Sequence, residues 1–258
     1  MDSLITSWHN FLLVSLRVGC LLLFLPPWDN RLLPGTVKVF FTLGFSLAVT
    51  PLVAPHLPPF PTTWIAGLYL ILREILWGLS VGLLFRFLFA GIQMAGNLVS
   101  IQMGFGMATL LDPQSQAQNT LLGEILVLLA LMVFLTIDGH HVLLRFLVQS
   151  FEELPLDFNL TFPRVLGGYL SSMGNLMFSL GIQLLAPVLA LLWLTQLALG
   201  LMARAVPQIH VLVVGFPLTI AVGLFFLTLT FMVLGPALVD QFAALRIPLH
   251  RVLESWKG

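Results

Sequence analysis

Few residues in this chain have the types and spacing that metal binding or catalysis requires. The stretch "IDGHH" brings Asp138, His140 and His141 together at the end of an apolar run, as a metal site would. Adjacent histidines project to different sides of a helix, and the spacing matches no zinc-protease signature. We therefore interpret Asp138, Gly139 and His140 as a polar helix end that turns at Gly139, and we expect no metal.

Two aspartates raise the question of an intramembrane hydrolase. Asp112 precedes the helix-breaking Pro113 and Asp138 precedes a glycine, so neither is expected in the middle of a membrane span. The serine in "NLVSIQMG" has no glycine pattern around it as a nucleophile would, and the "GFG" at residues 104–106 lacks the lysine of a phosphate loop. We predict no catalytic residue and no cofactor, and the chain is not expected to be an enzyme.

The composition predicts an integral membrane protein. Of 258 residues, 59% are hydrophobic and 9% are charged, whereas soluble domains carry roughly 25% charged residues. The net charge of zero argues against nucleic acid as a partner. The single cysteine, Cys20, excludes a disulfide within the chain and is read as a small buried hydrophobe. The first ten residues contain no lysine or arginine, so no signal peptide is expected.

The apolar runs are continuous rather than alternating, which indicates helices rather than strands. We predict an all-α membrane protein of six to seven apolar helices in the bilayer, with runs at 11–25, 37–54, 64–90, 121–137, 165–203 and 205–239. The two late runs contain prolines, so each is either one long kinked helix or a hairpin of two. Residues 138–158 are expected to form a short helix and loop outside the hydrocarbon, and the tail after residue 239 is amphipathic and basic.

Basic residues suggest an orientation. Arg31 and Lys38 near the start, and the basic tail, indicate cytoplasmic segments, whereas the proline-rich loop 55–63 without basic residues indicates the opposite side.

Polar side chains form a stripe along the third apolar run. On an ideal helix, small and hydrogen-bonding residues fall within about 40° of Arg86, and they are Gly82, Ala90, Gln93, Asn97 and Ser100. The stripe is either a helix–helix seam or the lining of a conduit, and in both cases it does not face lipid. Arg73 and Glu74 are adjacent and are expected to need separate partners, and Arg17 has no visible partner.

The segment 102–118 interrupts this apolar pattern. Gly104 and Gly106 flank Phe105 and allow unusual backbone conformations, and Asp112-Pro113 prevents a helix from continuing. Met103 and Met107 are bulky and adaptable. Because non-helical backbone at membrane depth must lie in protein or beside water, the segment predicts a movable constriction. The alternative is a plain loop at the membrane surface.

Three blocks carry a resemblance to a known family. They are "GFGMATLLDPQSQAQ", "FLTIDGHHVLLRFLVQSFEELPL" and "LLAPVLALLWLTQLALGLMARAVPQIHVLVVGFPLTI", in that order along the chain. Together they resemble the FliR/SctT family of type III export-gate subunits. The third block contains turn or packing positions at Pro187, Arg204, Pro207 and Gln208. The sequence departs from the family's usual residues at His210, where Asn is frequent, and at Thr219, where Lys is frequent.

The resemblance implies a FliP-like part at residues 1–164 followed by a FliQ-like part at 165–258. It implies assembly with FliP and FliQ in the bacterial inner membrane, contact with FlhB and FlhA, and passage of unfolded flagellar proteins. The family's plug falls within 102–118, which assigns gating to Met103, Gly104, Phe105, Gly106, Met107, Asp112 and Pro113. Arg86, Gln93, Asn97, Ser100 and Glu74 would then form a polar seam between helices or subunits.

A second function remains open from the residues alone. Arg86, Glu74 and Gln93 could form the solute site of a multi-pass secondary transporter that acts by itself.

Overall fold

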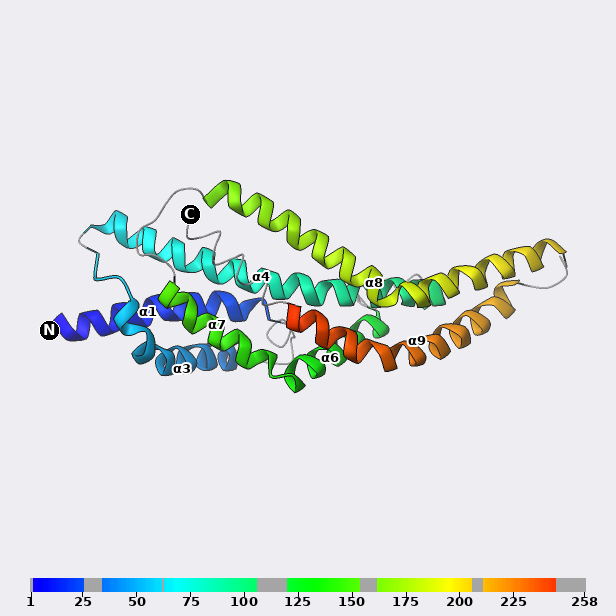
Figure 1. The fold of residues 1–258 in the computed structure, drawn as a ribbon, viewed down its shortest axis with the longest axis horizontal. Helices are drawn as coiled ribbons and strands as arrows, with labels where there is room; N and C mark the ends of the chain where they lie inside the picture. The colour runs from blue at the N-terminus through cyan, green and yellow to red at the C-terminus, as the bar shows by residue number, and fades with distance from the viewer. Residues whose placement is uncertain are drawn as a thin grey trace. The chain divides into compact units, whose positions relative to one another are not determined.

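The computed structural model describes residues 2–25, 34–61, 63–105, 120–153, 162–205 and 211–244. These ranges are helical and contain no strand, which confirms the predicted all-α membrane class. The elements in chain order (Figure 1) are α1 (Asp2–Leu23), α3 (Gly35–Val53), the short 3₁₀ helix η1 (Ala54–His56), α4 (Trp64–Met103), α6 (Leu121–Thr136), α7 (Gly139–Glu153), α8 (Phe162–Ala205) and α9 (Val211–Ala244).

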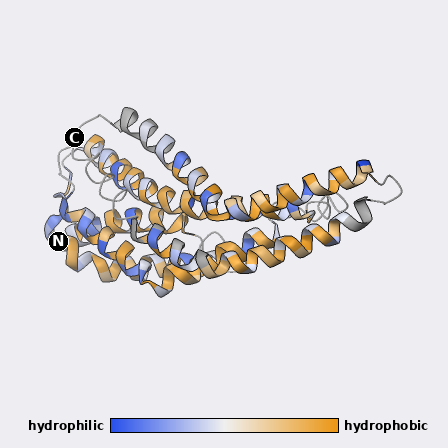
Figure 2. Cartoon of the chain, turned by 45° about the vertical axis from the view of Figure 1, so that its right-hand side comes forward, coloured by the Kyte–Doolittle hydropathy of each residue, from blue (hydrophilic) through white to orange (hydrophobic). Residues whose placement is uncertain are grey.

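Within the described residues, five helices are long and apolar enough to cross a membrane, and the count rises to six if the bent pair α6 and α7 forms one span. Hydrophobic residues cover most of the helix surfaces in Figure 2. The short helix predicted after residue 138 is α7, and its buried residues lie along one face, as in an amphipathic helix. The basic tail after Ala244 lies outside the described residues.

Each late apolar run contains one long helix rather than a hairpin of two. The helix α8 passes through Pro187 and α9 passes through Pro217 and Pro236 without a break. A proline removes one backbone hydrogen bond but does not end a helix whose neighbouring turns remain bonded. In Figure 1 the C-terminal part of α8 and the N-terminal part of α9 run side by side as a hairpin.

The helix α4 is longer than a bilayer requires. Its 40 residues correspond to about 60 Å, roughly twice the thickness of a hydrocarbon core. It continues 13 residues beyond the apolar run at 64–90. The most apolar part of α4 is largely buried within the protein, unlike the corresponding parts of α1, α3, α8 and α9. Contacts with protein therefore stabilise this part of α4.

The chain divides into two compact units, and each contains several separate segments. The first consists of residues 1–87, 138–173 and 244–258, and the second of residues 88–137 and 174–243. The chain passes between the units inside α4 and inside α8. The predicted division into a FliP-like part at 1–164 and a FliQ-like part at 165–258 concerns sequence likeness and not these compact units, and it stays a prediction.

A buried ion pair lies at the centre of the first unit. Arg17 on α1 donates from Nε to Oε2 of Glu74 on α4 at 2.5 Å, and both side chains have 0% exposure. Arg17 also donates from Nη1 to the Ser150 hydroxyl of α7 at 2.8 Å, and Ser150 donates to the Leu147 carbonyl. One guanidinium group thus connects three helices that are far apart in the sequence.

Aromatic rings complete the surroundings of the guanidinium. Its carbon lies 3.7 Å from the ring centre of Phe151 and 4.8 Å from that of Trp77. Such cation–π contacts are strongest where water is excluded. Trp77 in turn stacks on Phe146 of α7 with ring centres 5.8 Å apart. Arg17, for which the sequence offered no partner, therefore has charged, polar and aromatic ones.

The expectation that Arg73 and Glu74 would need separate partners was wrong in part. Arg73 Nε lies 3.6 Å from Glu74 Oε1, so the long arginine side chain reaches its neighbour although the two Cα–Cβ bonds diverge. Of the two arginines, Arg17 lies closer to the Glu74 carboxylate, at 2.5 Å.

The ion pair predicts a specific pattern of stability. Glu74→Gln leaves the buried Arg17 charge uncompensated and should lower the free energy of unfolding by about 3–5 kcal/mol. The double variant Arg17→Met with Glu74→Gln should regain part of that loss, because the fully buried guanidinium is removed together with its counter-charge. Denaturant titration of the wild type, Glu74→Gln, Arg17→Met and the double variant measures the coupling energy, and losses that add in the double variant would contradict the pairing.

Candidate functional site

The base of the segment that follows α4 lies in the second unit and begins with a glycine-capped helix end. Gly104 has a φ of 97°, a conformation that favours glycine. Its N–H donates to the Ile101 carbonyl at 3.0 Å, and the Phe105 N–H donates to the Ser100 carbonyl at 3.0 Å. These two bonds form a Schellman motif, in which the first residues after a helix turn back onto its last carbonyls.

The motif leaves the carbonyls of Gln102 and Met103 for other donors. Gln196 of α8 donates from Nε2 to the Gln102 carbonyl at 3.0 Å and to the Gln102 side-chain oxygen at 2.9 Å. Thr219 of α9 donates from its hydroxyl to the Met103 carbonyl at 3.1 Å. All four final carbonyls of α4 are therefore hydrogen-bonded, two by its own chain end and two by the α8–α9 hairpin.

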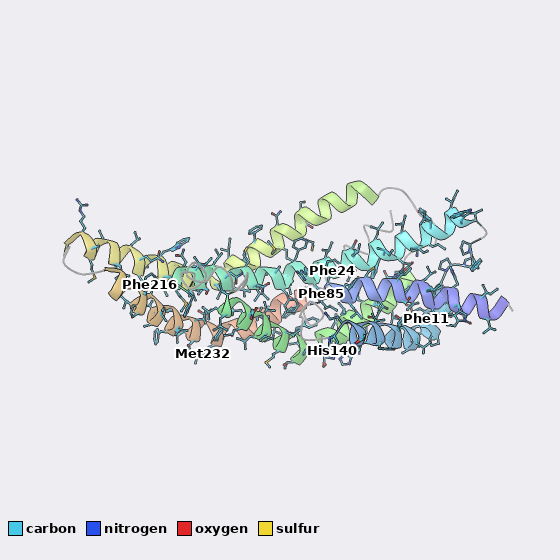
Figure 3. All side chains as sticks on the ribbon, turned by 180° about the vertical axis from the view of Figure 1, so that it is seen from behind. Phe11, Phe24, Phe85, His140, Phe216 and Met232 are labelled. Atoms are coloured by element: carbon cyan, nitrogen blue, oxygen red, sulfur yellow. The ribbon has the colours of Figure 1, made fainter. Side chains whose placement is uncertain are left out.

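Close packing fixes the same turn. The Met103 side chain has 0% exposure and lies against Gly223 of α9, where an added Cβ would come within 2.6 Å of it. A Cβ on Gly104 would come within 2.5 Å of the Phe216 ring; Figure 3 labels Phe216 on α9. The next residue, Phe105, is 40% exposed. The chain therefore leaves the packed helix end at Phe105.

Thr120, the first described residue after Phe105, contacts α4. Thr120, which caps the N-terminus of α6 by accepting from the Gly123 N–H, donates to Asn97 Oδ1 from its hydroxyl at 2.8 Å and from its backbone N–H at 3.2 Å. Asn97 precedes Met103 by six residues, or about 9 Å of helix. Phe105 and Thr120, the described residues on either side of 106–119, therefore both contact the last two turns of α4.

The gating residues assigned from the sequence are placed only in part. Met103, Gly104 and Phe105 form the base just described. Gly106, Met107, Asp112 and Pro113 lie outside the described residues. Thr219 was expected only as a departure from the family's usual residue, and Gln196 was not among the predicted site residues. The signal for Gln196 was present, because it is an amide in a run of 39 residues without a charge.

The residues of the polar stripe on α4 differ in how far they are buried. Arg86 is exposed, Gln93 and Asn97 are half-buried, and Ser100 is buried. Asn97 bonds to Thr120 of α6 as described, and Gly96 beside it packs on Gly123 so closely that an added Cβ would come within 2.7 Å of the Gly123 Cα. This part of the stripe is a contact between α4 and α6.

The transporter hypothesis required Glu74 and Arg86 to share a solute site. They lie on one straight run of α4 and are separated by twelve residues, or about 18 Å of helix. Glu74 is fully buried beside Arg17, whereas Arg86 is exposed. The structure does not bring these two groups together around a small solute.

The turn predicted at Gly139 lies one residue earlier. Asp138 adopts a φ of 58°, which aspartate tolerates better than most residues, and Gly139 is the first residue of α7. The Asp138 carbonyl accepts from the N–H groups of His141 and Val142, so it starts the new helix. The correction follows from this bonding, which a dipeptide pattern does not reveal.

Asp138, His140 and His141 form the one group among the described residues whose ligand atoms could hold a metal ion, all within 4.8 Å. His141 Nδ1 already lies 3.1 Å from Asp138 Oδ1, and both side chains are largely exposed. His140, labelled in Figure 3, lies at the start of α7 with its ring 4.2 Å from that of His141. An Asp–His contact across one helical turn accounts for this geometry without an ion.

Of the remaining predicted turn or packing positions, Pro187 lies inside α8 and Arg204 lies in its last turn, where a cation favours the helix dipole. Pro207, Gln208 and His210 lie outside the described residues.

Comparison with known proteins assigns the family. The profile of the family described as "Bacterial export proteins, family 1" matches residues 8–245. The chain is similar to the flagellar biosynthetic protein FliR of Bacillus subtilis (strain 168), with 36% identity over 227 residues that cover 86% of each chain. The chain belongs to the FliR family of bacterial export proteins.

Other FliR proteins show a similar extent of likeness. FliR of Escherichia coli (strain K12) is 36% identical over 223 residues, which cover 84% of this chain and 83% of that protein. FliR of Pectobacterium carotovorum is 35% identical over 235 residues, which cover 89% of this chain and 87% of that protein. The resemblance inferred from three sequence blocks is thus confirmed over most of the chain.

The helix end predicts a strong requirement for glycine at position 104. Gly104→Ala should lower the free energy of unfolding by about 2–4 kcal/mol, because it adds a left-handed alanine and a clash with Phe216. Gly200→Ala on α8 is the matched control, since nothing lies within 4 Å of its added Cβ, and it should be neutral or slightly stabilising. Thermal unfolding of both variants measures the difference, and equal effects would contradict the assignment.

Proposed function

We propose that this chain is a core subunit of the flagellar type III export gate, which forms with FliP and FliQ a gated conduit for unfolded flagellar proteins. The single observation that supports it is the base of the segment at Met103–Phe105 and Thr120. The described residues on either side of 106–119 both contact the last two turns of α4, Phe105 through the Ser100 carbonyl and Thr120 through Asn97, as expected if the segment between them is held at a fixed place in a channel. We expect Phe105, Met107 and their neighbours to close that channel.

The proposal gives the exposed surface of the chain a role. Trp8, Leu12, Trp193 and Leu197 are large apolar side chains with exposures of more than half. Lipid or apolar faces of FliP and FliQ would cover them. Exposed Arg86 on the apolar α4 requires water or protein rather than hydrocarbon. A polar seam between subunits, which includes Arg86, Gln93 and Ser100, would provide such surroundings.

The same assembly implies a place in the cell. We propose that the chain lies in the bacterial inner membrane at the flagellar basal body, next to FlhB and FlhA, with exported flagellar proteins as its substrates. Membership in a family of flagellar export proteins and the apolar helices support this location. The α4 length of about 60 Å fits a helix supported by protein neighbours over part of its course.

Removal of the bulky side chains tests the gate. Phe105→Ala with Met107→Ala should raise ion leakage through the assembled complex, because the residual segment would no longer fill the channel, whereas Met103 is packed against Gly223 and is left unchanged. Dye or ion flux from vesicles that contain the complex with FliP and FliQ measures it. Leu194→Ala on the exposed side of α8 serves as the control for loss of an apolar side chain.

Deletion of residues 106–118 gives the stronger form of this test. A correctly assembled complex without the segment should leak more than any side-chain variant. If the complex that lacks residues 106–118 is as impermeable as the parent, the proposal that this segment closes the channel is wrong.

Copurification addresses the partners. The chain expressed with FliP and FliQ should purify as one stable complex, and the chain expressed alone should aggregate on extraction, because its exposed apolar faces lose their cover. A stable monomer that binds a small solute would favour the transporter instead.

A further inference from the structure

We propose that the outer face of α6 (Leu121, Glu124, Leu128, Met132 and Leu135) is a docking surface for a membrane helix of a partner subunit, and that this helix presents a lysine or arginine to Glu124. The inference rests on the proposed function, in which the chain forms a complex with FliP and FliQ, and it adds where a partner binds and which chemistry recognises it. The surface belongs to the second unit and does not include residues 106–119.

The helix α6 has two different faces. Its buried residues pack toward the protein, and they are Leu122, Gly123, Leu126, Ala130 and Phe134. The residues of the outer face are exposed, and on an ideal helix they lie within about 40° of Leu128, opposite the buried ones. Leu121 is 74% exposed and Met132 is 66% exposed. The outer face is therefore a continuous apolar stripe with one carboxylate in it.

Glu124 is the one charged residue of α6. Within the part of the chain that the structure describes, its carboxylate forms no ion pair and accepts no hydrogen bond. The N-terminus of a helix favours a carboxylate nearby, but this effect falls off within the first turn and is smaller than the cost of placing a carboxylate in hydrocarbon. The helix dipole alone therefore does not account for Glu124 on this face.

Neither lipid nor water suits the whole outer face. Hydrocarbon would cover the apolar side chains but leave the carboxylate unsolvated. Water would solvate the carboxylate but leave a row of large apolar side chains exposed over about four turns. A membrane boundary at Glu124 does not resolve the conflict, because Leu121, the most exposed apolar residue of the face, lies one turn closer to the N-terminus. A protein partner with an apolar stripe and one cation suits every residue of the face.

The length of α6 agrees with a protein neighbour. Its 16 residues correspond to about 24 Å, which is less than the roughly 30 Å of a hydrocarbon core. It is not a candidate span by itself, and the chain bends by 68° between α6 and α7. A helix shorter than the bilayer is commonly accommodated by association with other helices.

The chemistry of the face defines its partner. A helix that packs on it needs apolar residues every three to four positions and a lysine or arginine at the level of Glu124. In an interface from which water is excluded, a misplaced like charge is costly, so the carboxylate selects a basic partner and its register.

Charge reversal tests the pairing. In the chain expressed with FliP and FliQ, Glu124→Lys should lower the yield of purified complex about tenfold, because two cations then meet where water is excluded. Glu124→Gln should lower it less, since it removes the attraction without adding repulsion. Glu152→Lys is the matched control, because it reverses a carboxylate on a face of α7 that also exposes Arg145 and Gln149 to water. It should leave the yield near that of the parent.

A compensating replacement separates a lost contact from a lost fold. Glu124→Lys also places a cation near a helix N-terminus, which by itself disfavours α6. In the presence of Glu124→Lys, each lysine and arginine in the membrane helices of FliP and FliQ is therefore replaced in turn by glutamate. One of these replacements should restore the yield to within about twofold of the parent, because the pair re-forms with its charges exchanged.

A photo-cross-linker at the centre of the face identifies what covers it. Benzoylphenylalanine in place of Leu128 should cross-link to FliP or FliQ when the complex is illuminated, and the size of the product distinguishes the two. Glu124→Lys should reduce this product severalfold, whereas Glu152→Lys should leave it unchanged. A face covered by lipid would give no protein product.

The results distinguish the docking surface from the proposed function. If the unchanged chain copurifies with FliP and FliQ but Glu124→Lys assembles as well as the parent, or position 128 gives no protein product, the inference is overturned and the export-gate function stands. Absence of any compensating replacement also overturns it. If the unchanged chain does not copurify with FliP and FliQ, the proposed function fails first and the inference falls with it. A product at position 128 with the same subunit that carries the compensating replacement supports the inference.

Discussion

The end of α4 shows the constraint on which the rest of this structure depends: backbone carbonyls that do not reach water must find donors within the protein. Hydrocarbon offers none, and an unsatisfied backbone group there costs several kcal/mol. At Ser100 and Ile101 the chain provides donors by turning back at Gly104. At buried Met103 the donor comes from Thr219, and at the half-buried Gln102 it comes from the exposed Gln196. The turn, the glycine and the hairpin side chains are consequences of one requirement.

The same requirement governs the buried polar groups of the first unit. Arg17 would be costly in an apolar environment, and it is kept by an ion pair with Glu74, a hydrogen bond to Ser150 and the rings of Phe151 and Trp77. Gly78 allows this closeness, because an added Cβ would come within 2.6 Å of the Arg17 carbonyl. Such a cluster contributes to specificity as well as stability, since these helices have little other means to fix their register.

The helix α4 takes part in the polar contacts of both units. Its Glu74 belongs to the ion pair, and its Asn97 and its final carbonyls support the two ends of residues 106–119. Asn97 contacts Thr120, the first described residue after 106–119, and the α8–α9 hairpin contacts the helix end that precedes them. The described residues on both sides of 106–119 are therefore attached to one helix.

The sequence by itself determined the membrane class, the helical secondary structure, the family and the interruption at residues 102–118, because these depend on composition, on continuous apolar runs and on local turn residues. It located Gly104 and Phe105, since a glycine-rich break is a local signal. Tertiary structure alone decided that Arg17 meets Glu74, that Asp138 rather than Gly139 makes the turn, and that Gln196 and Thr219 cap α4. Hydrogen bonds between residues roughly a hundred positions apart follow from helix packing, and no short pattern in one sequence records which donors that packing brings together.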